Sequence, residues 1–203
     1  MTISIADPAQ PQRTMTIESA APGWGLVMQS GGRIPCAVGI PLKTLLYEEF
    51  GLAPEQIGRI DVMLLDGMPV DAPEAAIVPH GARLALAAGL PGIAGLSMKS
   101  GSAVRGLRPG ITYKESRAEA PLPGGRGEVE LALFSLALAM LAGHFLARGV
   151  ILRAEQLTRY AVAYGEAPCL FCGQKRSVAE ALEELAPLPE DTPVLFVARL
   201  RTQ

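Results

Sequence analysis

The residues with the clearest chemical potential are two cysteines in the motif Pro-Cys-Leu-Phe-Cys-Gly, Cys169 and Cys172. Two thiols separated by two residues can bind one metal ion or close a small disulfide. The glycine that follows, Gly173, allows backbone amides to approach the sulfur atoms, as in zinc knuckles. Three interpretations of the pair stay open: a zinc site whose further ligands are unknown, a redox pair, and two small side chains that pack a loop.

The other soft ligands in the chain are Cys36, His80 and His144, and none of them forms a second cysteine pair. A four-ligand zinc site would therefore need carboxylates or a second copy of the chain. A redox Cys-x-x-Cys usually begins a helix. Here the helix signal comes later, as the capping box Ser177-Val-Ala-Glu180. The two histidines lie in dissimilar contexts, so the sequence identifies no catalytic residue.

Composition places the chain among ordered globular proteins. It has 203 residues, of which 49% are hydrophobic and 19% charged, enough to bury a substantial core. The net charge of −2 provides no basic field, so we expect no nucleic-acid binding. An odd number of cysteines, three, does not form a disulfide framework, and the N-terminal residues lack the pattern of a secretory signal. We therefore expect a cytoplasmic protein.

The longest apolar segment is Leu131–Ala147, which has no formal charge if His144 is neutral. Its length is at the lower limit for a membrane span, and we expect a buried core helix over Leu131–Arg148 instead. The same surface, if not covered within one chain, predicts a dimer interface. Periodicity also leaves a strand open for Glu128–Phe134, in which case Glu128 and Glu130 share one face.

Local patterns predict the remaining elements. Pro41–Phe50 has an apolar helical stripe, Asp66-Gly67 is a hairpin turn between two apolar runs, and the capping box begins another helix. The other expected elements are strands at Arg13–Ser19, Trp24–Ser30, Arg33–Val38, Ile60–Leu65, Ala82–Ala88, Ile111–Glu115 and Pro193–Leu200, and a helix at Ala154–Tyr164.

The helix Pro41–Phe50, the Leu-Leu-Asp-Gly-Met-Pro-Val hairpin at Leu64–Val70 and the strand entry at Ile77–Leu86 occur in the order found in ubiquitin-like β-grasp proteins. Over residues 13–95 the chain resembles this family, especially the sulfur carriers of molybdopterin and thiamine synthesis. The resemblance implies a β-grasp domain. The family's functional feature is a C-terminal Gly-Gly that becomes thiolated. Here the glycines between Gly89 and Gly95 include no Gly-Gly, and a carrier would require cleavage near Gly95.

These observations predict an α+β fold. A flexible tail at residues 1–12 would precede an N-terminal β-grasp (ubiquitin-like) domain at 13–96. A linker and loop at 97–127 would lead to a smaller helix-rich α/β domain at 128–203.

The function that we expect is a non-enzymatic interaction or adaptor protein that uses a β-grasp surface and binds a protein partner or forms a homodimer. One alternative is a metal- or thiol-dependent protein that uses Cys169 and Cys172, with zinc as the possible metal. A second alternative is a processed sulfur carrier. The sequence identifies no substrate or pathway.

Overall fold

The computed structural model of the chain describes residues 11–89, 113 and 125–201. These residues divide into two compact units. Unit 1 is built on Ile34–Ala137, and unit 2 combines Gln10–Arg33 with Leu138–Gln203. Unit 2 takes residues from both ends of the chain, whereas the domain boundaries expected at 13–96, 97–127 and 128–203 are consecutive in the sequence and stay a prediction. The expected tail at 1–12 and linker at 97–127 lie largely outside the described residues.

The strands of unit 1 have the order β2-β8-β7-β4-β5, and β3 pairs with β6 in a separate two-stranded sheet. Strand β4 is antiparallel to both β5 and β7, whereas β7 and β8 are parallel. The strands are β2 (Gly32–Val38), β3 (Ile40–Pro41), β4 (Val62–Leu65), β5 (Met68–Pro69), β6 (Ile77–Val78), β7 (Arg83–Ala88) and β8 (Gly125–Phe134).

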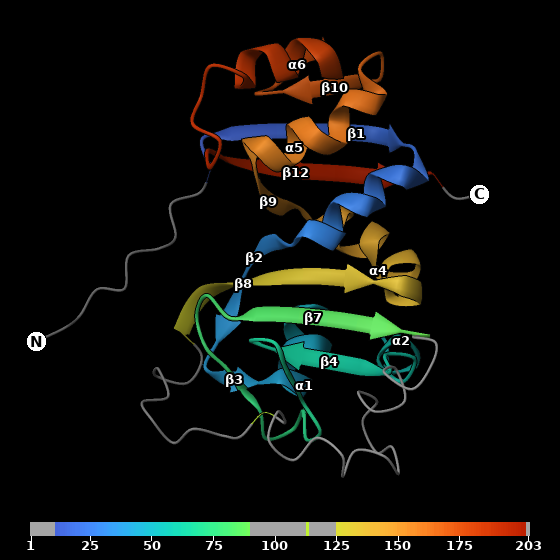
Figure 1. The fold of residues 1–203 in the computed structure, drawn as a ribbon, viewed down its shortest axis with the longest axis vertical. Coiled ribbons are helices and arrows are strands. Elements are labelled where there is room, and N and C mark those ends of the chain that lie inside the picture. Colours follow the sequence, from blue (N-terminus) through green and yellow to red (C-terminus); the bar gives the residue numbers. More distant parts are fainter. Residues whose placement is uncertain (1–10, 90–112, 114–124, 202–203) are drawn as a thin grey trace, which may run out of the picture. The chain divides into compact units, whose positions relative to one another are not determined.

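The predicted helix Pro41–Phe50 is confirmed as α1 (Leu42–Thr44), which continues as a π-helical turn, η2 (Leu45–Glu49). Its apolar stripe is fully buried, with Leu42, Leu45, Leu46 and Phe50 all 0% exposed. In Figure 1, α1 lies behind the strands of unit 1. A second short helix, α2 (Pro54–Ile57), begins at a proline, whose missing N–H is not needed in the first helical turn.

The predicted Asp-Gly turn is confirmed as the connection between β4 and β5. Leu65 pairs with Met68, which leaves a loop of two residues, Asp66 and Gly67. Both have positive φ, 50° and 79°, as a type I′ hairpin requires. The carboxylate of Asp66 also accepts a hydrogen bond of 2.8 Å from the backbone N–H of Arg83, which links the turn to β7.

The helix expected at Leu131–Arg148 is wrong in its first part. Strand β8 continues to Phe134, and helix α4 (Ser135–Arg148) begins at the next residue. Ser135 has a φ of 53°, and this left-handed conformation turns the chain from strand to helix without a loop. In β8, Val129, Leu131 and Leu133 are fully buried and alternate with more exposed residues, so an apolar run that periodicity cannot assign becomes a central strand.

Because this segment is a strand, Glu128 and Glu130 lie on the same face of the sheet. Arg83 on β7 pairs with Glu130 in the ladder, and their side chains form an ion pair of 3.3 Å.

No helix in the described parts of the chain combines the length and the apolar character needed to cross a bilayer.

The strands of unit 2 have the order β11-β10-β1-β12-β9, in which β1 and β12 are parallel and the other pairs antiparallel. The predicted capping box begins α6, and the predicted final strand is confirmed as β12. The elements are β1 (Arg13–Ala20), the 3₁₀ helix η1 (Pro22–Ser30), β9 (Val150–Arg153), α5 (Ala154–Ala161), η4 (Val162–Tyr164), β10 (Pro168–Phe171), β11 (Gln174–Ser177), α6 (Val178–Leu185) and β12 (Pro193–Leu200).

The strand expected at Trp24–Ser30 is wrong, because these residues belong to η1. Trp24 is 1% exposed. Its ring stacks on Tyr164 at 4.7 Å between centroids and lies 5.2 Å from Phe196. This aromatic packing joins η1 to residues that are far away in sequence. The alternation of apolar and polar residues within 24–30, which predicted a strand, contains no information about these distant contacts.

The expected fold, a β-grasp domain followed by a smaller helix-rich domain, is wrong. The described residues instead have mixed parallel and antiparallel strands in both units, with five in the unit 2 order and five in the unit 1 order. The C-terminal part of the chain contributes β8, β9, β10, β11 and β12, so it is a strand-forming part rather than a helical one. Pairing between the two ends of the chain, β1 with β12, is what local sequence patterns could not predict.

The Asp66-Gly67 turn gives a stability prediction. We expect Gly67→Ala to destabilise the chain by about 1 kcal/mol, because a Cβ is strained at positive φ. No atom lies within 4 Å of an added Cβ, so the loss comes from the backbone and not from a clash. Urea unfolding measures it. Gly67→Asn is the matched control, since asparagine tolerates this conformation better, and equal losses in the two variants would contradict the explanation.

Candidate functional site

The two cysteines of the Cys-x-x-Cys motif lie on the hairpin formed by β10 and β11. Phe171 pairs with Gln174, and Cys169 pairs with Arg176. Cys172 and Gly173 form the two-residue turn, with φ values of 48° and 80°. The glycine therefore serves the turn, and a regular antiparallel ladder extends to Cys169.

This register separates the two thiols. Cys169 is 5% exposed and its Sγ lies 3.5 Å from the carbonyl oxygen of Ser177, whereas Cys172 is exposed. An extended chain rises about 3.3 Å per residue, which places the two Cα atoms on the order of 9 Å apart. A disulfide requires a Cα separation below about 7 Å. At that separation the two cysteines cannot close a disulfide without movement of the backbone.

None of the three cysteines forms a disulfide. Within the described ranges, no group of three or more His, Cys, Asp and Glu side chains could hold a metal ion. Zinc binding by Cys169 and Cys172 therefore stays a prediction, and the described residues place no third ligand beside the pair.

Burial raises the pKa of the Cys169 thiol, and the nearby carboxylate of Glu180 raises it further. Both causes disfavour the thiolate, which is the reactive and metal-binding form. Cys169 is therefore a protonated, packed side chain at neutral pH.

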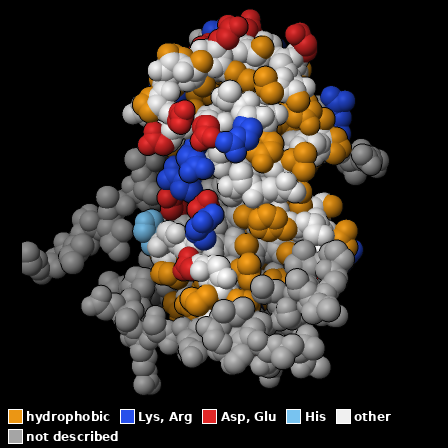
Figure 2. Space-filling model, viewed as in Figure 1, with side chains coloured by type: hydrophobic (Ala, Val, Ile, Leu, Met, Phe, Trp, Pro, Cys, Tyr) orange, Lys and Arg blue, Asp and Glu red, His pale blue; other side chains and the backbone are white. Residues whose placement is uncertain are grey.

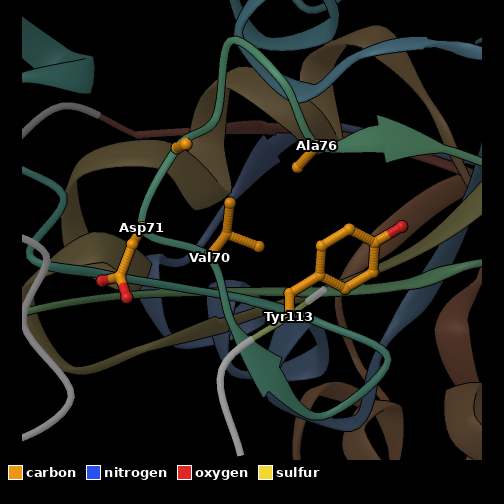
Figure 3. A pocket seen from close by; sticks show the side chains of 5 residues that line it. Val70, Asp71, Ala76 and Tyr113 are labelled. Atoms are coloured by element: carbon orange, nitrogen blue, oxygen red, sulfur yellow. The ribbon is translucent and has the colours of Figure 1, made fainter. Parts of the chain in front are cut away.

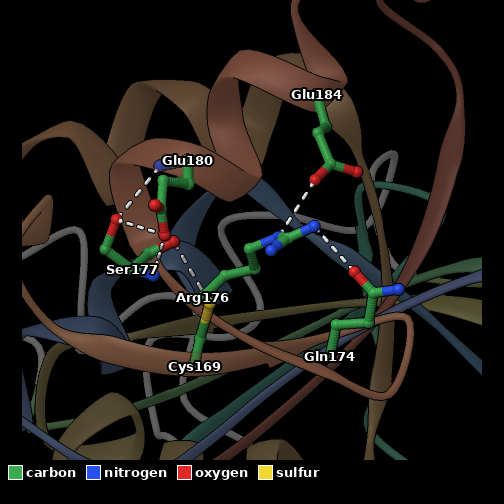
Figure 4. A network of polar contacts seen from close by, with 6 residues as sticks. All are labelled: Cys169, Gln174, Arg176, Ser177, Glu180 and Glu184. Atoms are coloured by element: carbon green, nitrogen blue, oxygen red, sulfur yellow. Dashed lines mark hydrogen bonds and ion pairs between the residues drawn. The ribbon is translucent and has the colours of Figure 1, made fainter.

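A polar network beside this thiol holds the start of α6 (Figure 4). The hydroxyl of Ser177 accepts the N–H of Glu180 at 3.2 Å, and the Glu180 carboxylate accepts the N–H of Ser177 at 2.7 Å. This is the predicted capping box. The hydrogen bond from the Ser177 backbone, followed by that from its hydroxyl, lowers the pKa of Glu180. Arg176 donates to Glu184 at 3.2 Å and to Gln174 at 2.7 Å, so the network is structural.

The remaining soft ligands also have structural contacts. His80 accepts a hydrogen bond of 3.3 Å from the backbone N–H of Glu128 through Nδ1. His144 contacts Phe145 edge to face, with ring centroids 5.3 Å apart. Cys36 is 2% exposed on β2. On the face drawn in Figure 2, acidic and basic side chains are interspersed, so that face has no extended basic patch of the kind that follows a nucleic-acid backbone.

The feature that sequence reasoning missed is a small cavity in unit 1 beside Tyr113 (Figure 3). It has a volume of about 140 Å³ and is lined by Val70, Asp71, Ala72, Ala76 and Tyr113. Small-molecule sites usually measure roughly 300–1,000 Å³, so this cavity has room for one side chain rather than for a cofactor.

Two hydrogen bonds fix Tyr113 at this cavity. Its backbone N–H donates to the carbonyl oxygen of Pro69 on β5 at 2.9 Å, and its hydroxyl donates to the carbonyl oxygen of Ile77 on β6 at 3.2 Å. The sequence signal was weak, since Tyr113 belongs to the expected strand Ile111–Glu115, and the rest of that segment lies outside the described residues. Unit 1 therefore places an aromatic residue from a distant part of the chain against its edge strand.

The sulfur-carrier hypothesis depends on glycines that are mostly outside the described residues, since Gly92 and Gly95 are not described. Gly89 has a φ of 64°, and its N–H donates to the carboxylate of Asp61 at 2.8 Å. No protein-family model, curated protein or solved structure matches the chain. The resemblance to sulfur carriers and the carrier function thus stay untested predictions.

The hairpin geometry predicts different reactivities for the cysteines. In the native chain we expect iodoacetamide to label Cys172 at least about tenfold faster than Cys169 or Cys36, because both of these thiols are buried, and the pKa of Cys169 is raised in addition. Peptide mass spectrometry measures the labelling of each site. Denatured protein is the control, in which all three should react, and labelling of native Cys169 as fast as Cys172 would show that the hairpin opens.

The capping box predicts a pH dependence of stability. The folded pKa of Glu180 lies below its ordinary value of 4.5, so its stabilising effect is complete above that value and is lost as the pH falls through the folded pKa. Glu180→Gln should therefore unfold at a lower urea concentration than the unsubstituted chain at pH 7, with the difference shrinking toward pH 3.

Glu183→Gln is the control, because it removes an exposed carboxylate from the same helix without touching Ser177. If both variants had the same pH dependence, the capping box would not be its source.

Proposed function

We propose that the chain is a non-enzymatic adaptor that holds an extended segment of another polypeptide on the edge strand of unit 1. The supporting observation is the hydrogen bond from the backbone of Tyr113 to Pro69 on β5. Strand β5 is the last strand of the described order, and the carbonyl oxygen of Pro69 there already accepts a hydrogen bond from Tyr113, a residue outside the sheet. Addition of a peptide to a sheet edge is a common recognition mode, in which backbone hydrogen bonds give affinity and side-chain pockets give specificity.

The chemistry of β5 suits a weak and reversible partner. The strand has two residues, Met68 and Pro69, and proline has no N–H to donate. An added segment can therefore form few backbone hydrogen bonds there. Met68 is 38% exposed, and its flexible thioether is suited to apolar contacts with differing partners. Affinity would thus depend on a few side-chain contacts rather than on a long ladder.

We place this adaptor in the cytoplasm, where it would bind a different protein or a second copy of itself. The absence of disulfides among its three cysteines is compatible with a reducing compartment. The large apolar side chains that unit 1 leaves partly exposed, among them Phe134 and Leu136 at 37% and 54%, support association with another polypeptide.

Photo-crosslinking in the native cells tests the proposed function. A benzophenone side chain at position 68 should form a covalent adduct with a specific polypeptide, because Met68 lies on the proposed docking edge. Mass spectrometry identifies the adduct. The matched control is position 162 in unit 2, since Val162 is 71% exposed and would capture nonspecific contacts at least as well.

An adduct that forms at 68 and not at 162 would support the adaptor function. Equal labelling of many proteins at both positions, or no protein adduct at 68, would overturn it.

A further inference from the structure

We infer that His80 is a pH-sensitive latch, whose neutral imidazole holds the start of β8 against the turn before β7 and whose protonated form releases it. The inference goes beyond the proposed adaptor function and does not depend on it. It rests on three residues of unit 1, His80, Gly81 and Glu128, which we call the histidine latch.

The latch occupies the last position of the pairing between β7 and β8. These strands are parallel, and every second residue of such a strand bonds to the same neighbour. Glu130 follows this rule, since its N–H donates to the carbonyl oxygen of Ala82 at 2.9 Å. Two residues earlier, the N–H of Glu128 donates to Nδ1 of His80 at 3.3 Å, and its carbonyl oxygen accepts the N–H of Gly81 at 2.8 Å. A side chain therefore takes the place of a backbone acceptor at this position.

This contact depends on the protonation state of the imidazole. Nδ1 can accept the N–H of Glu128 only through its lone pair, which is present in the neutral ring when the proton is on Nε2. In the imidazolium both ring nitrogens are donors, so neither can accept. A proton on Nδ1 and the hydrogen bond from Glu128 therefore exclude each other. Histidine is the side chain that ordinarily changes charge between pH 5 and 8, so the latch is closed above this range and open below it.

The packing around the ring couples the latch to the strand. A Cβ at Gly127 would lie 2.9 Å from Nδ1 of His80 and 2.8 Å from Val38 on β2, so the backbone of β8 is in close contact with both side chains. Gly127 is buried, whereas His80 is exposed and can exchange protons with solvent. An imidazolium N–H directed at the N–H of Glu128 places two donors face to face, so the ring and the start of β8 move apart.

Charge around the ring does not provide a substitute for the lost acceptor. The two acids and two arginines on β8 and β7 have formal charges that cancel, and one pair of them already forms an ion pair. Strand β2 has one charged residue, which lies five positions before Val38 (38 − 33). The charged side chains on the described elements that pack against the ring are Arg126, Glu128 and Glu130 on β8, Arg83 on β7 and Arg33 on β2.

Hydrogen–deuterium exchange followed by NMR tests the latch in the full chain. The protection of each amide is its intrinsic exchange rate divided by its measured rate at the same pH. We expect the protection of the Glu128 amide to fall about fivefold from pH 7.5 to pH 5, which corresponds to the loss of one hydrogen bond. The Glu130 amide, which donates to the backbone of Ala82, is the internal reference and should keep its protection.

His80→Asn is the matched variant, because a side-chain amide oxygen can accept the same N–H and does not titrate. Its Glu128 amide should be protected equally at both pH values. His144→Asn removes the other histidine of the chain and should leave the fivefold change in place.

Equal protection of Glu128 at pH 7.5 and pH 5 in the unsubstituted chain would overturn the inference, and this measurement needs no variant. The same fall in His80→Asn would also overturn it, because another group would then be the source of the pH dependence. So would a parallel fall at Glu130, since the sheet would then loosen as a whole and not at the latch.

Discussion

Parallel pairing of β7 and β8 is the constraint on which unit 1 depends. Antiparallel strands can be joined by a two-residue turn, as β4 and β5 are, but a parallel pair requires the chain to return to the opposite end of the sheet. The return between Ala88 and Gly125 contains Tyr113, which is bound at the β5 edge. The topology therefore makes a long connection obligatory, and the edge strand provides a place to fix it. The contact of Tyr113 with β5 is in this sense a consequence of the long connection that joins the parallel strands β7 and β8.

Sequence patterns predicted those parts of the fold that depend on neighbouring residues. The Asp66-Gly67 turn, the buried stripe of α1 and η2, and the capping box of α6 each involve residues within a few positions of one another. The wrong predictions involve pairing across the chain. Strand β8 was assigned in part to a helix because an apolar run is compatible with both, and its position between β2 and β7 decides the outcome. The parallel pairing of β1 with β12 left no local signal.

The same distinction applies to the candidate sites. The spacing of Cys169 and Cys172 was visible in the sequence, but only the register of β10 with β11 shows that one thiol is packed while the other lies in the turn. Tyr113 illustrates the opposite case, because its two partners are 36 and 44 positions away (113 − 77 and 113 − 69). No spacing rule connects these residues, and the cavity exists only when two distant parts of the chain, residues 70–76 and Tyr113, come together. Motifs thus identify reactive atoms, whereas topology decides what they can reach.

The proline at the β5 edge has a further consequence, for aggregation. An open strand edge can recruit identical strands one after another, which is how fibrils grow. Pro69 can accept a hydrogen bond but has no N–H to donate, so a ladder that begins there cannot continue past it in regular form. In unit 2, the end strand β11 carries Lys175 and Arg176, whose charge opposes stacking. Proline at β5 and positive charge at β11 therefore both oppose the addition of identical strands, so neither strand offers a template for polymerisation.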